Sequence, residues 1–295
     1  MDLRFFDRPA DFLDVAGDHL AAQPVLSTVM AGVADRVREQ AEAGVPWPEG
    51  VPCWFAVALD ADEVVGTAMR TARFGEYPAY LLPMPDDAAV LLARTLVERD
   101  EPVLGANGAL PTVQVFCEEM ARATGKQAVV GQHTRLFELG ELKEPPEVPG
   151  RLRPAALEEQ DLVSSWYDAF MADADEQAGR RPGVSAHETP APEEMRHRIE
   201  AGRVFVWEDP DGTPVHVTAA TMPSYGVSRV GPVFTPKEHR GRGIASRAVY
   251  EVSRLLRDSG ERACLFTDQA NPTSNKIYEA LGYQRLVDMA NMRVE

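Results

Sequence analysis

The sequence of 295 residues is long enough for two domains of ordinary size. Hydrophobic residues make up 44% of it and charged residues 26%, which excludes disorder as the main state and predicts buried cores. A net charge of −16 and the lack of an apolar run that could span a bilayer argue against nucleic-acid and membrane binding. A start without a secretory leader and three dispersed cysteines predict a cytoplasmic protein with no disulfide framework and no metal site.

The first half of the chain predicts alternating helices and strands. Apolar spacing indicates helices within about 10–42, 86–97 and 112–123. Strands are predicted as a hairpin of 54–59 with 64–71, and at 79–82, near 103 and near 135–139. Residues 144–150 contain three prolines and a glycine, which excludes a helix or a central strand. We therefore expect a domain at 1–144, a linker at 145–150 and a second domain at 151–295.

The second half predicts a similar order of elements. We expect a helix at 157–171, a surface loop at 172–194, a short helix near 195–201 and a hairpin of 204–207 with 215–221. A strand at 229–235, interrupted by Gly231-Pro232, precedes a helix that starts near 244 and is closed by Gly260. A strand at 263–267, a helix at 273–281 and one or two strands at 283–294 follow. The two halves match loosely, so we interpret the chain as a degenerate duplication.

The informative segment is the glycine-rich start of the helix near residue 244. The first N–H groups of a helix need acceptors, yet no Ser, Thr, Asp or Asn occupies 239–243. Arg240 and Arg242 lie at the positive end of the helix dipole, where basic side chains are unfavourable. Gly241 and Gly243 let a ligand approach the backbone closely. This combination predicts a site for a diphosphate.

Other interpretations of this segment fit less well. A bare Arg-Gly-Arg-Gly sequence could be a solvated basic turn, but the strand before it and the amphipathic helix after it favour an anion site. A Walker A loop is excluded because GxxxxGK[ST] is absent. The dinucleotide fingerprint is half matched, since its third glycine is missing. A single Arg-Gly copy in so acidic a chain does not indicate RNA binding.

Two motifs in the right order carry a family resemblance. Arg240-Gly241-Arg242-Gly243-Ile244-Ala245 fits the pattern Arg/Gln-x-x-Gly-x-Gly/Ala, and Asn271-Pro272-Thr273-Ser274-Asn275-Lys276-Ile277-Tyr278-Glu279-Ala280-Leu281-Gly282-Tyr283 follows after one helix and one strand. The chain thus resembles the GNAT (Gcn5-related N-acetyltransferase) family, most specifically over about 229–283. Tandem GNAT proteins such as mycothiol synthase offer a looser parallel for both halves.

The resemblance implies an α/β fold class with two tandem GNAT-like acyl-CoA N-acyltransferase folds, the first degenerate. Each would have a central mixed, mostly antiparallel sheet flanked by helices. The resemblance also implies an acyltransferase with acetyl-CoA as co-substrate, transferring the acetyl group to a primary amine of a small molecule by direct attack on the thioester. A longer acyl group, a hydroxyl acceptor or a non-catalytic acyl-CoA-binding or regulatory module are the alternatives. The chain could be a monomer or a homodimer.

The family's site residues carry over by motif. Main-chain amides of the glycine-rich loop would bind the pyrophosphate of acetyl-CoA, which implies Arg240, Gly241, Arg242, Gly243, Ile244, Ala245 and Ser246. The pantetheine arm would lie along Val233, Phe234 and Thr235, where a bulge at Gly231-Pro232 would open the strand pair. Asn271 and Ser274 would contact the CoA arm, and Tyr278 falls at the usual general-acid tyrosine. The candidate general bases are Glu208, Asp209, His216, Glu238 and Asp268, among which the motif does not choose.

The first half departs from this pattern. Its strand at 79–82 is followed by Pro83-Met84-Pro85-Asp86-Asp87-Ala88, in which Asp86 or Asp87 would cap the helix and repel phosphate. We therefore expect this half to bind no CoA. It holds 24 acidic against 12 basic residues up to residue 147, which favours a cationic acceptor if this half completes the acceptor pocket.

Overall fold

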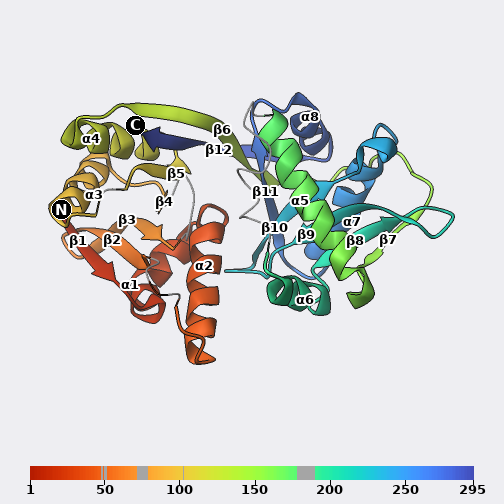
Figure 1. The fold of residues 1–295 in the computed structure, drawn as a ribbon, viewed down its shortest axis with the longest axis horizontal. Helices are drawn as coiled ribbons and strands as arrows, with labels where there is room; N and C mark the ends of the chain where they lie inside the picture. Colours follow the sequence, from red (N-terminus) through yellow and green to blue (C-terminus); the bar gives the residue numbers. More distant parts are fainter. Residues whose placement is uncertain (48, 50–51, 72–78, 102, 178–189) are drawn as a thin grey trace. The chain divides into compact units, whose positions relative to one another are not determined.

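The computed structural model describes residues 1–47, 49, 52–71, 79–101, 103–177 and 190–295. The chain divides into two compact units (Figure 1). Unit 1 consists of Met1–Leu136 with Val287–Glu295, and unit 2 of Phe137–Leu286. The division therefore differs from the one drawn at the proline-rich linker. Residues 137–150 belong to unit 2, and the end of the chain returns to unit 1.

Unit 1 carries alternating elements along the chain. They are β1 (Asp2–Phe6), α1 (Pro9–Ala22), α2 (Pro24–Glu42), β2 (Trp54–Asp60), β3 (Glu63–Arg70), β4 (Ala79–Leu81), α3 (Asp86–Glu98), β5 (Gly105–Ala109), α4 (Thr112–Thr124) and β6 (Ala128–Leu139), whose last residues enter unit 2. The sequence did not predict β1, and it placed β5 two residues too early because Gly105–Ala109 is poor in strand-forming residues.

Unit 2 repeats this order of helices and strands. Its elements are β7 (Arg151–Pro154), a short 3₁₀ turn (Leu157–Glu159), α5 (Gln160–Gln177), α6 (Pro192–Glu200), β8 (Val204–Glu208), β9 (Pro214–Ala220), β10 (Val227–Phe234), a second 3₁₀ turn (Lys237–His239), α7 (Ile244–Asp258), β11 (Arg262–Asp268), α8 (Pro272–Ala280) and β12 (Tyr283–Val294). The expected loop at 172–194 is partly wrong, because α5 continues to Gln177; residues 178–189 lie outside the described part of the chain.

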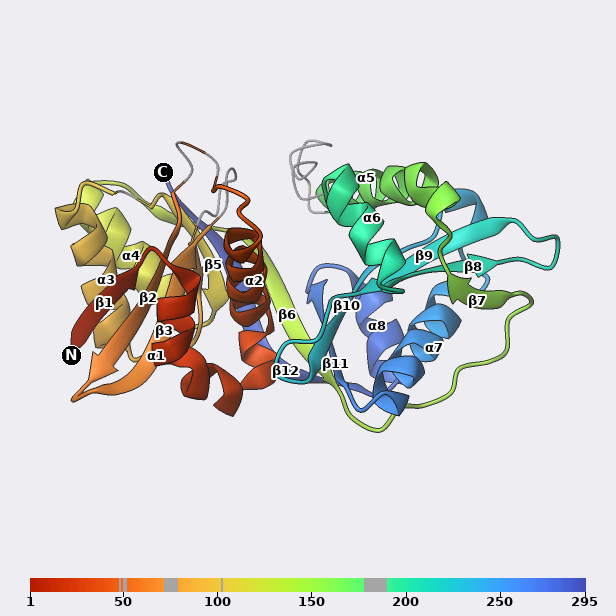
Figure 2. The same ribbon diagram turned by 90° about the horizontal axis from the view of Figure 1, so that it is seen from below.

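Each unit has a mixed sheet (Figure 2). In unit 1 the order β1-β2-β3-β4-β5 is antiparallel except that β4 and β5 run parallel, and the end of β12 pairs with β5 from Met289↔Ala109 to Arg293↔Gly105. In unit 2 the order β7-β8-β9-β10-β11 is antiparallel up to the parallel pair β10–β11, and β6 follows next to β11. This confirms the predicted mixed, mostly antiparallel sheets.

Both faces of each sheet are covered by helices. In unit 1, Leu81 and Ala106 pack with Leu92 of α3 and Phe116 of α4, whereas Phe12 of α1 stacks on Phe55 of β2. In unit 2, the α5–α6 face buries Tyr167, Met195, Val206 and Phe234, and the α7–α8 face buries Val230, Val249, Val252, Leu265 and Tyr278. No helix among the described residues is long and apolar enough to cross a membrane.

Candidate functional site

The strand β10 contains the predicted bulge. Val230 pairs with Ala220 of β9, but the next pair is Val233↔Thr218, so β10 has gained one residue between the two pairs. Gly231 there has φ of +148°, a conformation that favours glycine. On its other side, β10 pairs with β11 over Val227–Arg229, and no further pair joins the two strands among the described residues. The second half of β10 is thus available for an added strand-like ligand.

The glycine-rich loop leaves a row of main-chain donors without acceptors. Helix α7 begins at Ile244 with Gly243 as its N-cap, and no side chain caps it. Gly241 and Gly243 have φ of +76° and +81°, which glycine alone adopts without strain. In the described part of the chain, no protein acceptor receives the N–H groups of Gly241–Ser246. These groups stand at the positive end of the α7 dipole, so they would hold an anion.

The side chain of Arg240 is committed within unit 2. Its Nε donates to the Thr235 carbonyl oxygen at 2.7 Å, and its guanidinium forms a short ion pair with Asp173 of α5. Its main-chain N–H donates to the Lys237 carbonyl oxygen at 3.3 Å, so the row of unpaired donors starts at Gly241 rather than at Arg240. The role of Asp173 had no signal in the sequence, because α5 carries several acids and their spacing does not show which one faces the loop.

Tyr278 lies in the apolar layer beneath α7. The side chain is 8% exposed and shares a cluster with Val230 of β10 and Leu265 of β11, and its ring meets Tyr283 edge-on at 6.1 Å. Burial raises the pKa of the Tyr278 hydroxyl to about 12, so the phenol stays protonated at neutral pH. A protonated phenol in this place can give a proton to a leaving group.

The start of α8 shows a local role for the two predicted CoA contacts. Asn271 is the N-cap of α8, and its Oδ1 accepts the N–H of Ser274 at 3.1 Å. The Asn-Pro sequence therefore folds as a capped helix start, which is a sufficient reason for Asn at this position. Any contact of Asn271 or Ser274 with CoA would have to come in addition to this cap.

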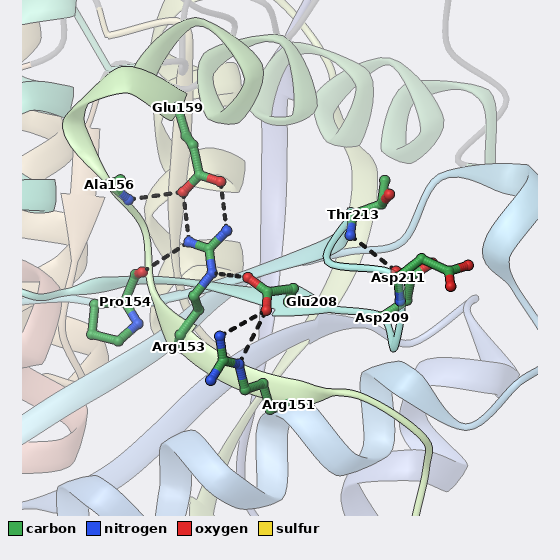
Figure 3. A network of polar contacts seen from close by, with 9 residues as sticks. All are labelled: Arg151, Arg153, Pro154, Ala156, Glu159, Glu208, Asp209, Asp211 and Thr213. Carbon is green, nitrogen blue, oxygen red and sulfur yellow. Dashed lines mark hydrogen bonds and ion pairs between the residues drawn. The ribbon is translucent and has the colours of Figure 1, made fainter.

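Two of the candidate bases serve the β8–β9 hairpin (Figure 3). The Glu208 carboxylate accepts Nε of Arg153 at 2.5 Å and a guanidinium nitrogen of Arg151 at 2.9 Å, and these bonds, led by Arg153, hold its pKa below the usual value. The Asp209 Oδ1 accepts the N–H groups of Asp211 and Thr213, which closes the turn. Both carboxylates are thus structural.

The other candidate bases differ in exposure. His216 is 0% exposed, and burial lowers its pKa to about 3. Because the ring is fully buried and both of its nitrogens have threonine partners, His216 is disfavoured among the candidate bases. Asp268 ends β11 and accepts the Ala270 N–H at 2.8 Å, and Glu238 is exposed in the turn before the glycine-rich loop. No cluster of His, Cys, Asp and Glu suited to a metal ion occurs among the described residues.

Comparison with known proteins shows which fold this arrangement of strand, loop and helix resembles. A family model described as "FR47-like protein" matches residues 211–294, which contain the bulged strand, the glycine-rich loop and Tyr278. A GNAT-family acetyltransferase from Colwellia psychrerythraea aligns over 100% of both chains with a TM-score of 0.57 and 11% identity. The chain has the GNAT fold. No curated protein matches the sequence.

Further solved structures extend the likeness to both halves. A GCN5-related N-acetyltransferase from Sphaerobacter thermophilus covers 99% of this chain and 95% of its own, with a TM-score of 0.58 and 15% identity. A tandem GNAT protein from the clavulanic acid biosynthesis pathway covers 99% and 98%, with a TM-score of 0.54 and 12% identity. The predicted resemblance to GNAT proteins is therefore confirmed at the level of the fold, and the tandem GNAT fold accounts for the repeated order of elements.

Proposed function

We propose that this protein is an acetyl-CoA-dependent N-acetyltransferase that acts on a primary amine of a small molecule. The observation that carries the proposal is the row of unpaired main-chain N–H groups from Gly241 to Ser246 at the start of α7. Most of these donors are exposed or half-buried, so an anion at the positive end of α7 could replace water as their acceptor. The pyrophosphate of acetyl-CoA has the charge and the acceptors to satisfy them.

The bulged strand supports acetyl-CoA over a simpler phosphate ligand. β10 stops pairing with β11 after Arg229, just before the segment Val233–Thr235 that leads into the glycine-rich loop. The amide groups of a pantetheine arm can pair with such a strand as an added strand would. A ligand whose pyrophosphate lies at the loop would then direct its thioester along β10 toward the cluster that holds Tyr278.

The chemistry requires three proton transfers. The acceptor must attack as a free amine, but an alkyl ammonium has a pKa of about 10.4 and is protonated at neutral pH. A proton therefore passes first to water or to a carboxylate such as that of Asp268. The nitrogen then forms the C–N bond, the C–S bond breaks, and the thiolate takes the proton of the Tyr278 hydroxyl. The proton that the attacking nitrogen loses returns to the phenolate through solvent, which restores the enzyme. The acidic composition of the chain favours a cationic acceptor.

A matched pair of glycine variants tests the anion site. Gly241 and Gly260 have φ of +76° and +82°, and an added Cβ at either position would meet nothing within 4 Å. Gly241→Asp and Gly260→Asp therefore carry similar backbone strain at opposite ends of α7, but only the first places a carboxylate among the unpaired donors. We expect Gly241→Asp to weaken acetyl-CoA binding in titration calorimetry by about 100-fold and Gly260→Asp by less than threefold. Equal affinities for the two variants would place the pyrophosphate elsewhere.

Turnover is measured as CoA release from acetyl-CoA over a panel of small amines, with alcohols and longer acyl-CoA esters as the comparison. Release with an amine, and formation of the corresponding amide, is the expected result. Tight binding of acetyl-CoA without release on any acceptor would instead support an acyl-CoA-binding module. Failure of the wild-type protein to bind acetyl-CoA would overturn the proposal.

A further inference from the structure

The buried imidazole of His216 bonds to two threonine hydroxyls. Its Nδ1 lies 2.7 Å from Oγ1 of Thr235 and its Nε2 lies 2.5 Å from Oγ1 of Thr218. His216 and Thr218 follow each other along one face of β9, whereas Thr235 comes directly after β10 and before the glycine-rich loop. Since His216 is fully buried, a ring nitrogen that lost its partner there could not turn to water instead.

The bond between His216 and Thr235 exists only because β10 is bulged. In the ladder before the bulge, Val230 pairs with Ala220; continued without the extra residue, that register would set Phe234 opposite His216. The extra residue sets Phe234 opposite Val217 and brings Thr235 to His216. The side chains agree with this shift, because Val230 packs on the α7 face and Phe234 on the α5 face, although residues four apart in a regular strand share a face.

Thr235 links the bulged register of β10 to the glycine-rich loop through a hydrogen bond with Arg240. Its carbonyl oxygen accepts Nε of Arg240 at 2.7 Å, and the guanidinium of Arg240 also binds Asp173 and lies 5.6 Å from the Phe234 ring. The position of Thr235 therefore helps to fix the Arg240 side chain beyond the 3₁₀ turn, and the unpaired donors begin at the next residue, Gly241.

We propose that His216 is a positioning residue that holds β10 in its bulged register and thereby places the glycine-rich loop for acetyl-CoA. This role rests on the proposed function, but it concerns a residue that touches neither acetyl-CoA nor the reacting atoms. The imidazole acts as a neutral hydrogen-bonding group, which agrees with its low pKa. In the regular register Nδ1 would face the Phe234 ring and have no hydroxyl partner, so the buried histidine disfavours that register.

Two amide variants separate the bonds of His216. The side-chain amide of Asn lies where Nδ1 stands, and that of Gln reaches the place of Nε2. His216→Asn therefore keeps a partner for Thr235, and His216→Gln keeps one for Thr218. We expect the Kd of acetyl-CoA to rise by less than threefold for His216→Asn and by at least tenfold for His216→Gln. We also expect faster hydrogen exchange of residues 233–235 in the Gln variant without acetyl-CoA.

A second pair of variants tests the same two bonds in case the His216 variants do not fold. Thr235→Val and Thr218→Val each remove one hydroxyl with little change of shape, and valine suits a strand. Thr235→Val should show the weakened binding and the faster exchange, and Thr218→Val neither. Equal behaviour within each pair overturns the proposal. If wild-type protein does not bind acetyl-CoA, the proposed function fails, whereas the exchange difference still decides whether His216 holds the register.

Discussion

The crossover from β4 to α3 in unit 1 occupies the same place in the repeated order of elements as the crossover from β10 to α7 in unit 2. The two differ in how the first N–H groups of the following helix are bonded. Residues 82–85 join β4 to α3, whereas 235–243 join β10 to α7. At the start of α3, the N–H of Ala88 donates to Oδ1 of Asp87 and to the Pro85 carbonyl oxygen, which also accepts the N–H of Ala89. At the start of α7 the N–H of Arg247 likewise donates to the Gly243 carbonyl oxygen, but the N–H of Ser246, which corresponds to Ala88, has no protein acceptor among the described residues.

The two units also differ in the pairing of the strand before the crossover with its parallel neighbour. β4 pairs with β5 over its whole length, from Ala79↔Ala106 to Leu81↔Gly108. A Cβ on Gly108 would lie 2.4 Å from the Leu81 carbonyl oxygen, so the two strands are tightly closed there. In unit 1 local acceptors thus receive the Ala88 N–H and the strand pair is closed, whereas in unit 2 the Ser246 N–H is unpaired and β10 separates from β11 after Arg229. On the proposed function, one fold would serve as a scaffold in unit 1 and as a ligand site in unit 2, and the difference would lie in a few residues of one loop.

Helices α4 and α8, which hold equivalent places in the two units, show a further difference. Ala109-Leu110-Pro111-Thr112 before α4 and Ala270-Asn271-Pro272-Thr273 before α8 share three residues in register. The same register places Cys117 at the position of Tyr278. Cys117 is fully buried, and burial raises the pKa of its thiol to about 12. Unit 1 therefore lacks the phenol at the position where unit 2 has its candidate general acid.

The largest expected effect comes from removing the Tyr278 hydroxyl, which has no counterpart at the equivalent position of unit 1. Tyr278→Phe keeps the ring in the cluster with Val230 and Leu265 and removes the hydroxyl alone. We expect kcat for amine acetylation to fall about 100-fold while the KM for acetyl-CoA changes less than threefold, because the phenol acts in the departure of the thiolate. Cys117→Ser at the equivalent place in unit 1 is the control and should leave kcat unchanged. A Tyr278→Phe variant that keeps the wild-type kcat would remove Tyr278 from the mechanism.

A smaller effect is expected from the ion pairs that close unit 1. The Glu119 carboxylate of α4 accepts Nε of Arg94 of α3 at 2.6 Å and Nε of Arg122 at 2.8 Å. These bonds, led by the one from Arg122, lower the pKa of Glu119 from 4.5 to about 2. A lowered pKa means that the stabilisation is complete above pH 4.5 and is lost as the pH falls toward 2. Both arginines are exposed, so we expect Glu119→Gln to lower the free energy of unfolding by about 1–2 kcal/mol at pH 7.

The pH profile checks that assignment. In urea titrations the wild-type protein should lose this increment between about pH 4.5 and pH 2, and the two proteins should converge at the acid end of the range. Arg38→Gln, which removes the exposed ion pairs with Asp35 and Glu42, is the matched control and should change stability little at either pH. A constant difference between wild type and Glu119→Gln over this range would show that the carboxylate charge is not what stabilises α3 against α4.

Much of this contrast could be predicted from the sequence because it is local. The glycines at 241 and 243, the missing N-cap residue and the aspartates at 86 and 87 each act within one turn of a helix. The sharing of β6 and β12 between the units could not be predicted, since a strand's own pattern shows which face is buried and not which strand it joins. The bonding of His216 was missed for the same reason: its partner Thr235 directly follows another strand, and only the bulged register brings the two together.

The smallest expected effect tests whether α3 is closed by its own acid. Asp87→Ala removes the side-chain acceptor of the Ala88 N–H and a negative charge at the positive end of α3, whereas Asp87→Asn keeps an acceptor and removes the charge. We expect the alanine variant to lose about 1 kcal/mol of unfolding free energy and the asparagine variant about half of that. Neither should change the affinity or the stoichiometry of acetyl-CoA, because the donors proposed to bind it lie at the start of α7. A second bound acetyl-CoA in Asp87→Ala would mean instead that this carboxylate alone closes unit 1 to the ligand, and that the short loop at 82–85 does not.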